Sequence, residues 1–350
     1  MLTWAEIDGQ QRALAVLERA ITTDHVHHAY LFTGPPGVGK FQVAHAMAAV
    51  VNCLARAEGQ FADLCGVCTS CRKIGNKQHP DILFIEPDGN IVKNIKIAQI
   101  REIQKSAVSA PYEARIRVVI LNDAHQMTEE ASNALLKTLE EPSMRMRLIL
   151  VTDQPHRLLD TIISRCQAIR FGALDQAVVV SRLELLLAKD GEAVSKELVA
   201  VAAGYGEGSL GRSLAIVRSG MLEGRREFLG EVLGIGPGQP RALLALAESW
   251  SKAGEAMGER LDVLKLFLRD VMLFKTSGER RVVNHDLLEL VERCAMPATI
   301  DDVLEMIAHV CRAQDLLTRN VNAQLILEEL LREFARFNYS GNSGKTRVSA

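Results

Sequence analysis

The segment from Gly34 to Lys40 has the residue types and the spacing of a site that holds nucleotide phosphates. It reads GPPGVGK and fits the pattern G-x-x-x-x-G-K. In such a loop the glycines let backbone N–H groups converge on a phosphate, and the lysine reaches the outer phosphates. A predicted apolar strand precedes it and an Ala/Val/Met-rich helix follows it, which favours a phosphate loop over an ordinary strand-to-helix turn. The candidate nucleotide-binding residues are Gly34, Gly37, Gly39 and Lys40.

The parts that would hold Mg²⁺ are incomplete. Phe41 stands where a Ser or Thr hydroxyl would ligate the ion, and a phenyl ring has no donor atom for a hard cation. An active ATPase also needs an acidic residue after a buried strand, commonly followed by a Glu that activates water. The predicted strand 117–121 is followed by Asn122 and Asp123, or in the other register Asp123 holds the metal and Ala124 follows it. Neither register gives two carboxylates, so we expect no ATP hydrolysis, no Mg²⁺ site, and weak or no ATP or ADP binding.

Four cysteines form a second group of residues that could bind a metal. Cys53, Cys65, Cys68 and Cys71 have the spacing C-x11-C-x2-C-x2-C. Four thiolates on a short segment suit a tetrahedral zinc ion, and four protein ligands leave no open position for a substrate. The alternatives are buried thiols without a metal, a redox pair, or an iron–sulfur cluster, although the spacing matches no ferredoxin pattern. We expect a structural zinc within a module at 53–79.

Composition limits the classes of protein that the chain can belong to. Its 350 residues suggest two or three domains, and 48% hydrophobic with 24% charged residues is typical of a soluble globular chain. A net charge of −2 does not indicate a protein whose main role is to bind nucleic acid. No apolar run is long enough to span a bilayer, and the N-terminus is no signal peptide. We therefore expect a cytoplasmic protein with no membrane partner, where clustered cysteines indicate a metal rather than disulfides.

The elements that must position these residues alternate between strand and helix over the first half of the chain. This alternation predicts an α/β fold, a parallel sheet with helices on both faces, followed by an all-α part. After residue 174 only helical patterns occur, interrupted by glycines. The predicted strands lie at 28–32, 81–85, 117–121, 147–151 and 167–171. The predicted divisions are an α/β domain at 1–172, a small helical domain at 173–219, a helical bundle at 220–338 and a disordered tail at 339–350.

Four features occur in an order that resembles a known family. They are the GPPGVGK loop, the four cysteines, the segment NALLKTLEEP at 133–142 and the tripeptide SRC at 164–166. In this order they resemble the clamp-loader branch of the AAA+ proteins, and the resemblance extends to residues 320–325. It implies a RecA-like domain with an inserted zinc module, a helical lid, and a collar bundle that joins five subunits in a ring.

The resemblance also implies a role for each matching residue. The ATPase subunits of that family, γ/τ, carry Lys-Ser or Lys-Thr in the phosphate loop and Asp-Glu at the strand that here precedes Asn122. This chain has Phe41 and Asn122 at those places, which indicates the non-hydrolysing stator type of subunit. The matching Arg165 would act as an arginine finger on the nucleotide of a neighbouring γ/τ subunit, with Ser164 positioning the turn. The stretch 208–212 resembles a nucleotide-sensing lid motif, but we expect Arg212 to be only a helix-start residue.

The implied partners are the γ/τ and δ subunits in a hetero-pentamer, and through that complex the sliding clamp and primed DNA. The implied function is to help load the clamp, with no catalysis by this chain itself, since DNA polymerase activity belongs to the holoenzyme. One alternative is an ATP-hydrolysing, γ/τ-like subunit. Another is zinc-dependent nucleic-acid binding as the primary role. The net charge of −2 argues against it, because nucleic-acid binding depends on positive charge.

Overall fold

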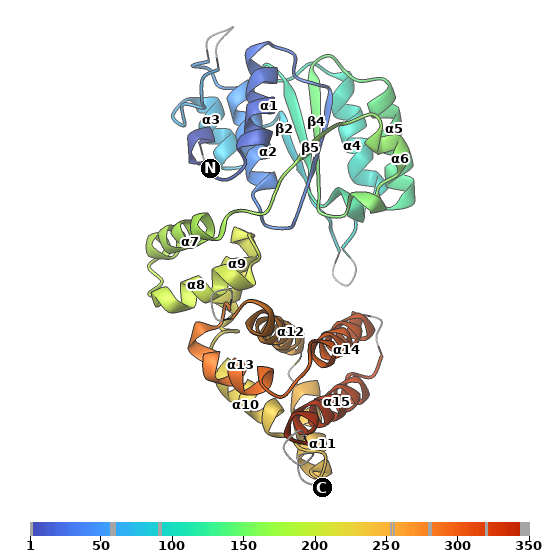
Figure 1. Ribbon diagram of the computed structural model, residues 1–350. Coiled ribbons are helices and arrows are strands. Elements are labelled where there is room, and N and C mark those ends of the chain that lie inside the picture. The colour runs from blue at the N-terminus through green and yellow to red at the C-terminus, as the bar shows by residue number, and fades with distance from the viewer. Residues whose placement is uncertain are drawn as a thin grey trace. The chain divides into compact units, whose positions relative to one another are not determined.

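Five parallel strands form one sheet in the order β2-β3-β4-β1-β5 (Figure 1). The computed structural model describes residues 3–56, 61–89, 93–252, 254, 256–278, 282–318 and 321–343. The strands are β1 (Ala29–Thr33), β2 (Ile82–Ile85), β3 (Arg117–Leu121), β4 (Met146–Thr152) and β5 (Gln167–Arg170). Each predicted strand overlaps one of them, and the predicted α/β fold with a parallel sheet is confirmed.

Helices cover both faces of this sheet, as a parallel sheet requires when its strands are apolar on both sides (Figure 1). Alternate side chains of β1 enter different cores: Tyr30 and Phe32 pack on one face, and Ala29 and Leu31 on the other. The first face is covered by α1 (Gln11–Thr22), α2 (Lys40–Val51) and α3 (Thr69–Gly75). The second is covered by α4 (Ile97–Val108), α5 (Glu129–Glu140) and α6 (Asp160–Ile163).

The chain divides into two units. The first consists of Met1–Arg182 and Glu207–Arg212, and the second of Leu183–Gly206 and Ser213–Ala350. Short 3-10 helices in the first unit are η1 (Trp4–Glu6), η2 (Ala124–Gln126) and η3 (Pro155–Arg157). Two helices begin in the first unit and end in the second, α7 (Gln176–Asp190) and α9 (Leu210–Ser219).

All regular elements in the described part of the second unit are helical. Besides the ends of α7 and α9 they are α8 (Lys196–Tyr205), α10 (Arg225–Gly234), α11 (Pro240–Ser251), α12 (Ala256–Ser277), η5 (His285–Leu287), α13 (Leu288–Ala295), α14 (Ile300–Thr318) and α15 (Ala323–Ser343). The predicted all-α part is therefore confirmed. The helix α15 passes the predicted boundary at 338, and the rest of the predicted tail, 344–350, lies outside the described residues. The division into three domains and a tail stays a prediction.

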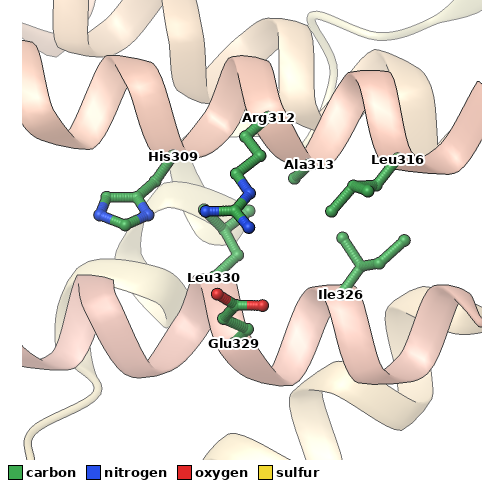
Figure 2. Close-up of a pocket in the computed structure, with 7 residues that line it drawn as sticks. All are labelled: His309, Arg312, Ala313, Leu316, Ile326, Glu329 and Leu330. Atoms are coloured by element: carbon green, nitrogen blue, oxygen red, sulfur yellow. The ribbon is translucent and has the colours of Figure 1, made fainter.

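A small gap lies between α14 and α15 (Figure 2). Ala313, Leu316 and Ile326 line its apolar side, and the side chains of Arg312 and Glu329 extend between the two helices. Its volume of about 10 Å³ leaves room for one water molecule at most, so it is a packing gap and not a ligand site. Among the described residues, no helix combines the length and apolar character needed to cross a membrane.

Candidate functional site

The predicted phosphate loop connects β1 to α2, and its lysine is bound by the loop itself. Gly39 precedes α2 with a φ of 100°, and Gly34 has a φ of 143° with no room for a Cβ beside the carbonyl of Phe171. The Nζ of Lys40 donates to the carbonyl oxygens of Gly34 at 2.7 Å and Pro35 at 2.6 Å. Burial lowers the pKa of Lys40, which the nearby carboxylates partly offset. These two glycines of the loop therefore have positive φ values, and two of its own carbonyls bind the lysine.

The tip of the loop packs against the start of α9, within the same unit. The carbonyl of Gly37 accepts a hydrogen bond from the N–H of Gly211 at 3.1 Å, and a Cβ on Gly37 would overlap the hydroxyl of Ser209. That hydroxyl accepts a bond from the N–H of Arg212 at 3.1 Å. Arg212 is the third residue of α9, and its side chain pairs with Glu207 at 3.4 Å. Gly37 therefore fills a structural position as well as a place in the loop motif.

Phe41 belongs to an aromatic cluster on the sheet. Its ring centroid lies 6.0 Å from that of Phe84 on β2 and 6.1 Å from that of His45. The ammonium of Lys77 lies 5.1 Å from the Phe41 centroid, within the range of a cation–π interaction. The side chain that replaces a magnesium-binding hydroxyl therefore contributes to packing and offers no oxygen to a metal.

Three potential metal ligands meet at the carboxyl ends of β3 and β4. Asp123, His125 and Asp153 each offer one ligand atom within 4.8 Å of the others. His125 is buried, and its Nδ1 lies 3.4 Å from the Asp153 carboxylate and 3.1 Å from the Thr152 hydroxyl. Burial raises the pKa of Asp123, whose carboxylate accepts a hydrogen bond from Asn122 at 3.2 Å.

Asp123 is predicted at this edge from its place after a buried strand, whereas Asp153 is not predicted. The signal was present, because Asp153 lies two residues after the predicted strand 147–151, and the carboxyl ends of parallel strands share one edge. The three donors could hold a divalent cation in an arrangement that differs from the usual hydroxyl and paired carboxylates.

The four predicted cysteine ligands converge. The Sγ atoms of Cys53, Cys65, Cys68 and Cys71 all lie within 4.8 Å of one another. A tetrahedral zinc with Zn–S bonds of about 2.3 Å needs sulfurs about 3.8 Å apart, so the group fits such an ion. The N–H groups of Cys65, Cys68 and Cys71 donate to the preceding sulfurs at 3.5, 3.3 and 3.4 Å, which stabilises thiolates. This cluster can hold a metal such as zinc.

Cys53 follows the end of α2 and Cys71 lies in α3. Both side chains are buried in the core on this face of the sheet. The backbone N–H groups of Cys68 and Val67 lower the pKa of the Cys65 thiol to about 6, whereas burial raises that of Cys71. The cysteine group therefore joins the 53–71 segment to the α2–α3 layer.

The Ser-Arg-Cys tripeptide lies at the opposite edge of the sheet from the phosphate loop. Ser164 follows α6, and Arg165 comes two residues before β5. In the parallel pairing of β1 with β5, Gln167 lies beside Tyr30, so Arg165 is near the start of β1 while the loop follows its end. Burial raises the pKa of the Cys166 thiol to about 12.

Two partners hold the guanidinium of Arg165. Its Nη2 lies 2.9 Å from an oxygen of Glu140, and its Nη1 donates to the carbonyl of Thr161 at 2.9 Å. The hydroxyl of Ser164 also donates to the Thr161 carbonyl, at 3.2 Å. An open pocket of about 510 Å³ lies beside the arginine. Its lining residues are His27, His28, Leu139, Ser164, Arg165, Cys166 and Gln167.

The chain is similar to known proteins along nearly its whole length. The family model "DNA polymerase III, delta subunit" matches residues 9–175, and "DNA polymerase III, delta subunit, C terminal" matches 220–336. The DNA polymerase III subunit delta′ of Bacillus subtilis is 33% identical over 339 residues, which cover 94% of this chain and 98% of that protein. This chain belongs to the DNA polymerase III δ′ family. The clamp-loader resemblance stated from the sequence motifs is thereby confirmed.

A tau subunit and a γ subunit-related protein of DNA polymerase III are also similar to this δ′-family chain. The DNA polymerase III subunit tau of Escherichia coli is 31% identical over 264 residues, which cover 75% of this chain and 40% of tau. A crystal structure of a γ subunit-related protein from Thermotoga maritima covers 93% of this chain and is 20% identical, with a TM-score of 0.43. This chain therefore spans less than half of the tau subunit that it matches.

Proposed function

We propose that this chain is a non-hydrolysing stator subunit of a DNA polymerase III clamp loader, with γ/τ and δ subunits as partners in a hetero-pentamer. Through that complex it would help load the sliding clamp on primed DNA. It would have no catalysis of its own, and DNA polymerase activity would belong to the holoenzyme. The proposed location is the cytoplasm, where cysteines remain reduced and free to bind zinc.

The position of Arg165 relative to the chain's own phosphate loop carries this proposal. Gln167 pairs with Tyr30 and Arg170 with Thr33, the last residue before the loop, and Arg165 lies in the turn before Gln167. At about 3.3 Å per residue, the three steps from Gln167 to Arg170 already span roughly 10 Å along the strand, beyond the reach of an arginine side chain. A guanidinium at this edge can serve the nucleotide of a neighbouring subunit, where it stabilises charge on the transferring phosphoryl group.

The phosphate loop itself supports the non-hydrolysing part of the proposal. Lys40 donates to carbonyls of its own loop, Phe41 packs among aromatic rings, and Asn122 offers a neutral amide. The second candidate is a γ/τ-like ATPase, and one observation favours it: the three donors Asp123, His125 and Asp153 meet at the same edge as the loop. We rank it second because none of these residues replaces the hydroxyl missing at Phe41.

The experiment that tests the proposal measures ATP turnover by a reconstituted loader with Arg165→Ala or Arg165→Lys. An arginine finger contributes on the order of 10³-fold or more at the site that it serves, and lysine cannot reproduce its planar fork. Both variants should therefore lower turnover at the neighbouring site while the complex still assembles by size exclusion. Turnover equal to that of the unmodified loader would dismiss the finger.

The isolated chain separates the two candidates. If it is a stator, its steady-state ATP hydrolysis stays at background, and Lys40→Ala changes nothing. Hydrolysis well above background that disappears in Lys40→Ala would favour the ATPase instead, because the lysine would then contact the outer phosphates. We also propose that Cys53, Cys65, Cys68 and Cys71 hold one structural zinc, since their sulfurs fit a closed tetrahedral site.

A further inference from the structure

The ion pair between Arg165 and Glu140 brings together two helices of the first unit. Glu140 is the last residue of α5, and Arg165 follows α6 directly. The Glu140 carboxylate binds Nη2 at 2.9 Å, and the Thr161 carbonyl, from α6, binds Nη1 at 2.9 Å. One guanidinium is thus held from two sides beside the open pocket, by an ion pair with Glu140 and by a hydrogen bond to Thr161 that uses one of its five N–H donors.

We propose that Glu140 is a positioning residue for Arg165, which keeps the guanidinium in the conformation that meets a neighbouring subunit's phosphate. The inference rests on the proposed role of Arg165 in trans. An arginine side chain has many rotamers, and a group that is fixed before the encounter loses less freedom when the phosphate arrives. The ion pair with Glu140 supplies that fixation, while the N–H donors that Thr161 does not use can contact the phosphate.

A purely structural role explains this pair poorly. The Arg165 side chain is 36% exposed and that of Glu140 is 50% exposed, and ion pairs this accessible contribute little to folding stability. The packing of α5 and α6 is apolar, with Leu135, Leu139 and Ile162 all buried in one core. Removal of the Glu140 charge should therefore leave the fold intact and act on the arginine.

The test compares Glu140→Gln with Glu141→Gln in the reconstituted loader. Glu141 is the adjacent exposed carboxylate, so its substitution changes the local charge equally without touching the ion pair. We expect Glu140→Gln to lower kcat for ATP by about two- to fivefold, the range that one exposed ion pair spans. The KM for ATP should stay within about twofold, because the neighbouring subunit binds the nucleotide, and Glu141→Gln should change neither constant.

The double variant Glu140→Gln/Arg165→Ala separates positioning from structure. If Glu140 acts through Arg165, the double variant has the turnover of Arg165→Ala alone. An additional loss in the double variant, or a kcat in Glu140→Gln that is unchanged or raised, would overturn the positioning role while Arg165→Ala remains defective. If Arg165→Ala itself has full turnover, the proposed function fails, and the role of Glu140 fails with it.

Discussion

Asp81 joins the loop before β3 to the start of β2, and Asp81→Asn tests how strongly that connection stabilises the first unit. The carboxylate is fully buried and accepts N–H bonds from Tyr112 and Glu113 at 2.8 Å and from Ala114 at 2.9 Å. The Nη2 of Arg117 donates to it at 2.9 Å. Burial by itself raises the pKa of Asp81, but these donors outweigh it and lower the pKa to about 2.

The size and sign of the effect follow from that pKa. A decrease of about 2 units from the ordinary value near 3.8 corresponds to roughly 2.5 kcal/mol of stability. Because the pKa is lower in the folded state, this contribution is present above about pH 4 and is lost as the pH falls toward 2. Asp81→Asn also leaves the buried Arg117 without its carboxylate. The loss of one member of a buried pair costs about 3–5 kcal/mol, which we expect at neutral pH.

The assay is urea unfolding followed by tryptophan fluorescence. The chain has two tryptophans: Trp4 lies in the first unit and Trp250 in the second, and both are buried. A Trp250→Phe background leaves Trp4 to report on the unit that contains Asp81. Unfolding is measured from pH 7 downward for the background, for Asp81→Asn, and for the exposed control Asp88→Asn, which we expect to change stability by less than about 0.5 kcal/mol.

Two results would refute this reasoning. One is a loss below about 1 kcal/mol at pH 7, which would mean that the N–H donors and Arg117 do not depend on the carboxylate. The other is a difference in the free energy of unfolding between Asp81→Asn and its background that stays constant down to pH 3. If the folded pKa of Asp81 is near 2, its protonation in the unfolded state must reduce that difference as the pH falls.

The remaining predictions concern the cysteine group and the phosphate loop. Chelation of zinc should expose the thiols of the 53–71 segment to a thiol reagent. The cooperative melting of the first unit should remain, since its sheet has two apolar cores of its own. Global unfolding on chelation would contradict this. Cys65→Ser should lower the zinc content measured by atomic absorption, whereas Cys294→Ser should not, because Cys294 lies in α13. Gly37→Ala should destabilise the fold by about 1–3 kcal/mol in thermal or urea unfolding, because its φ of 68° disfavours a side chain and its Cβ would overlap Ser209. The control Gly230→Ala, in α10 with open space around it, should leave stability unchanged or raise it.

Local patterns in the sequence were enough to predict the strands, the phosphate loop and the cysteine group. A buried parallel strand is a short apolar run, and β1 to β4 follow that rule, whereas in β5 only Ile169 is buried. The phosphate loop and the four cysteines depend on spacings of a few residues, which the chain's own turns convert into proximity. The mismatch at Phe41 was visible in the same way, since one residue type is either able or unable to bind a cation.

Only the tertiary structure placed residues from distant segments together. Glu140 meets Arg165 because α5 and α6 pack on the same face, and Asp153 meets His125 because β3 and β4 are neighbours in the sheet. No sequence period encodes which strands pair, so the sequence could place Asp153 at the carboxyl end of a strand but could not show that it meets His125, or that Glu140 meets Arg165. The parallel register of β1 with β5 likewise decides that Arg165 and the phosphate loop lie at opposite edges. The sequence determines which chemical groups the chain carries, and the order of strands in the sheet determines which of them can act together, because side chains react only over a few ångströms.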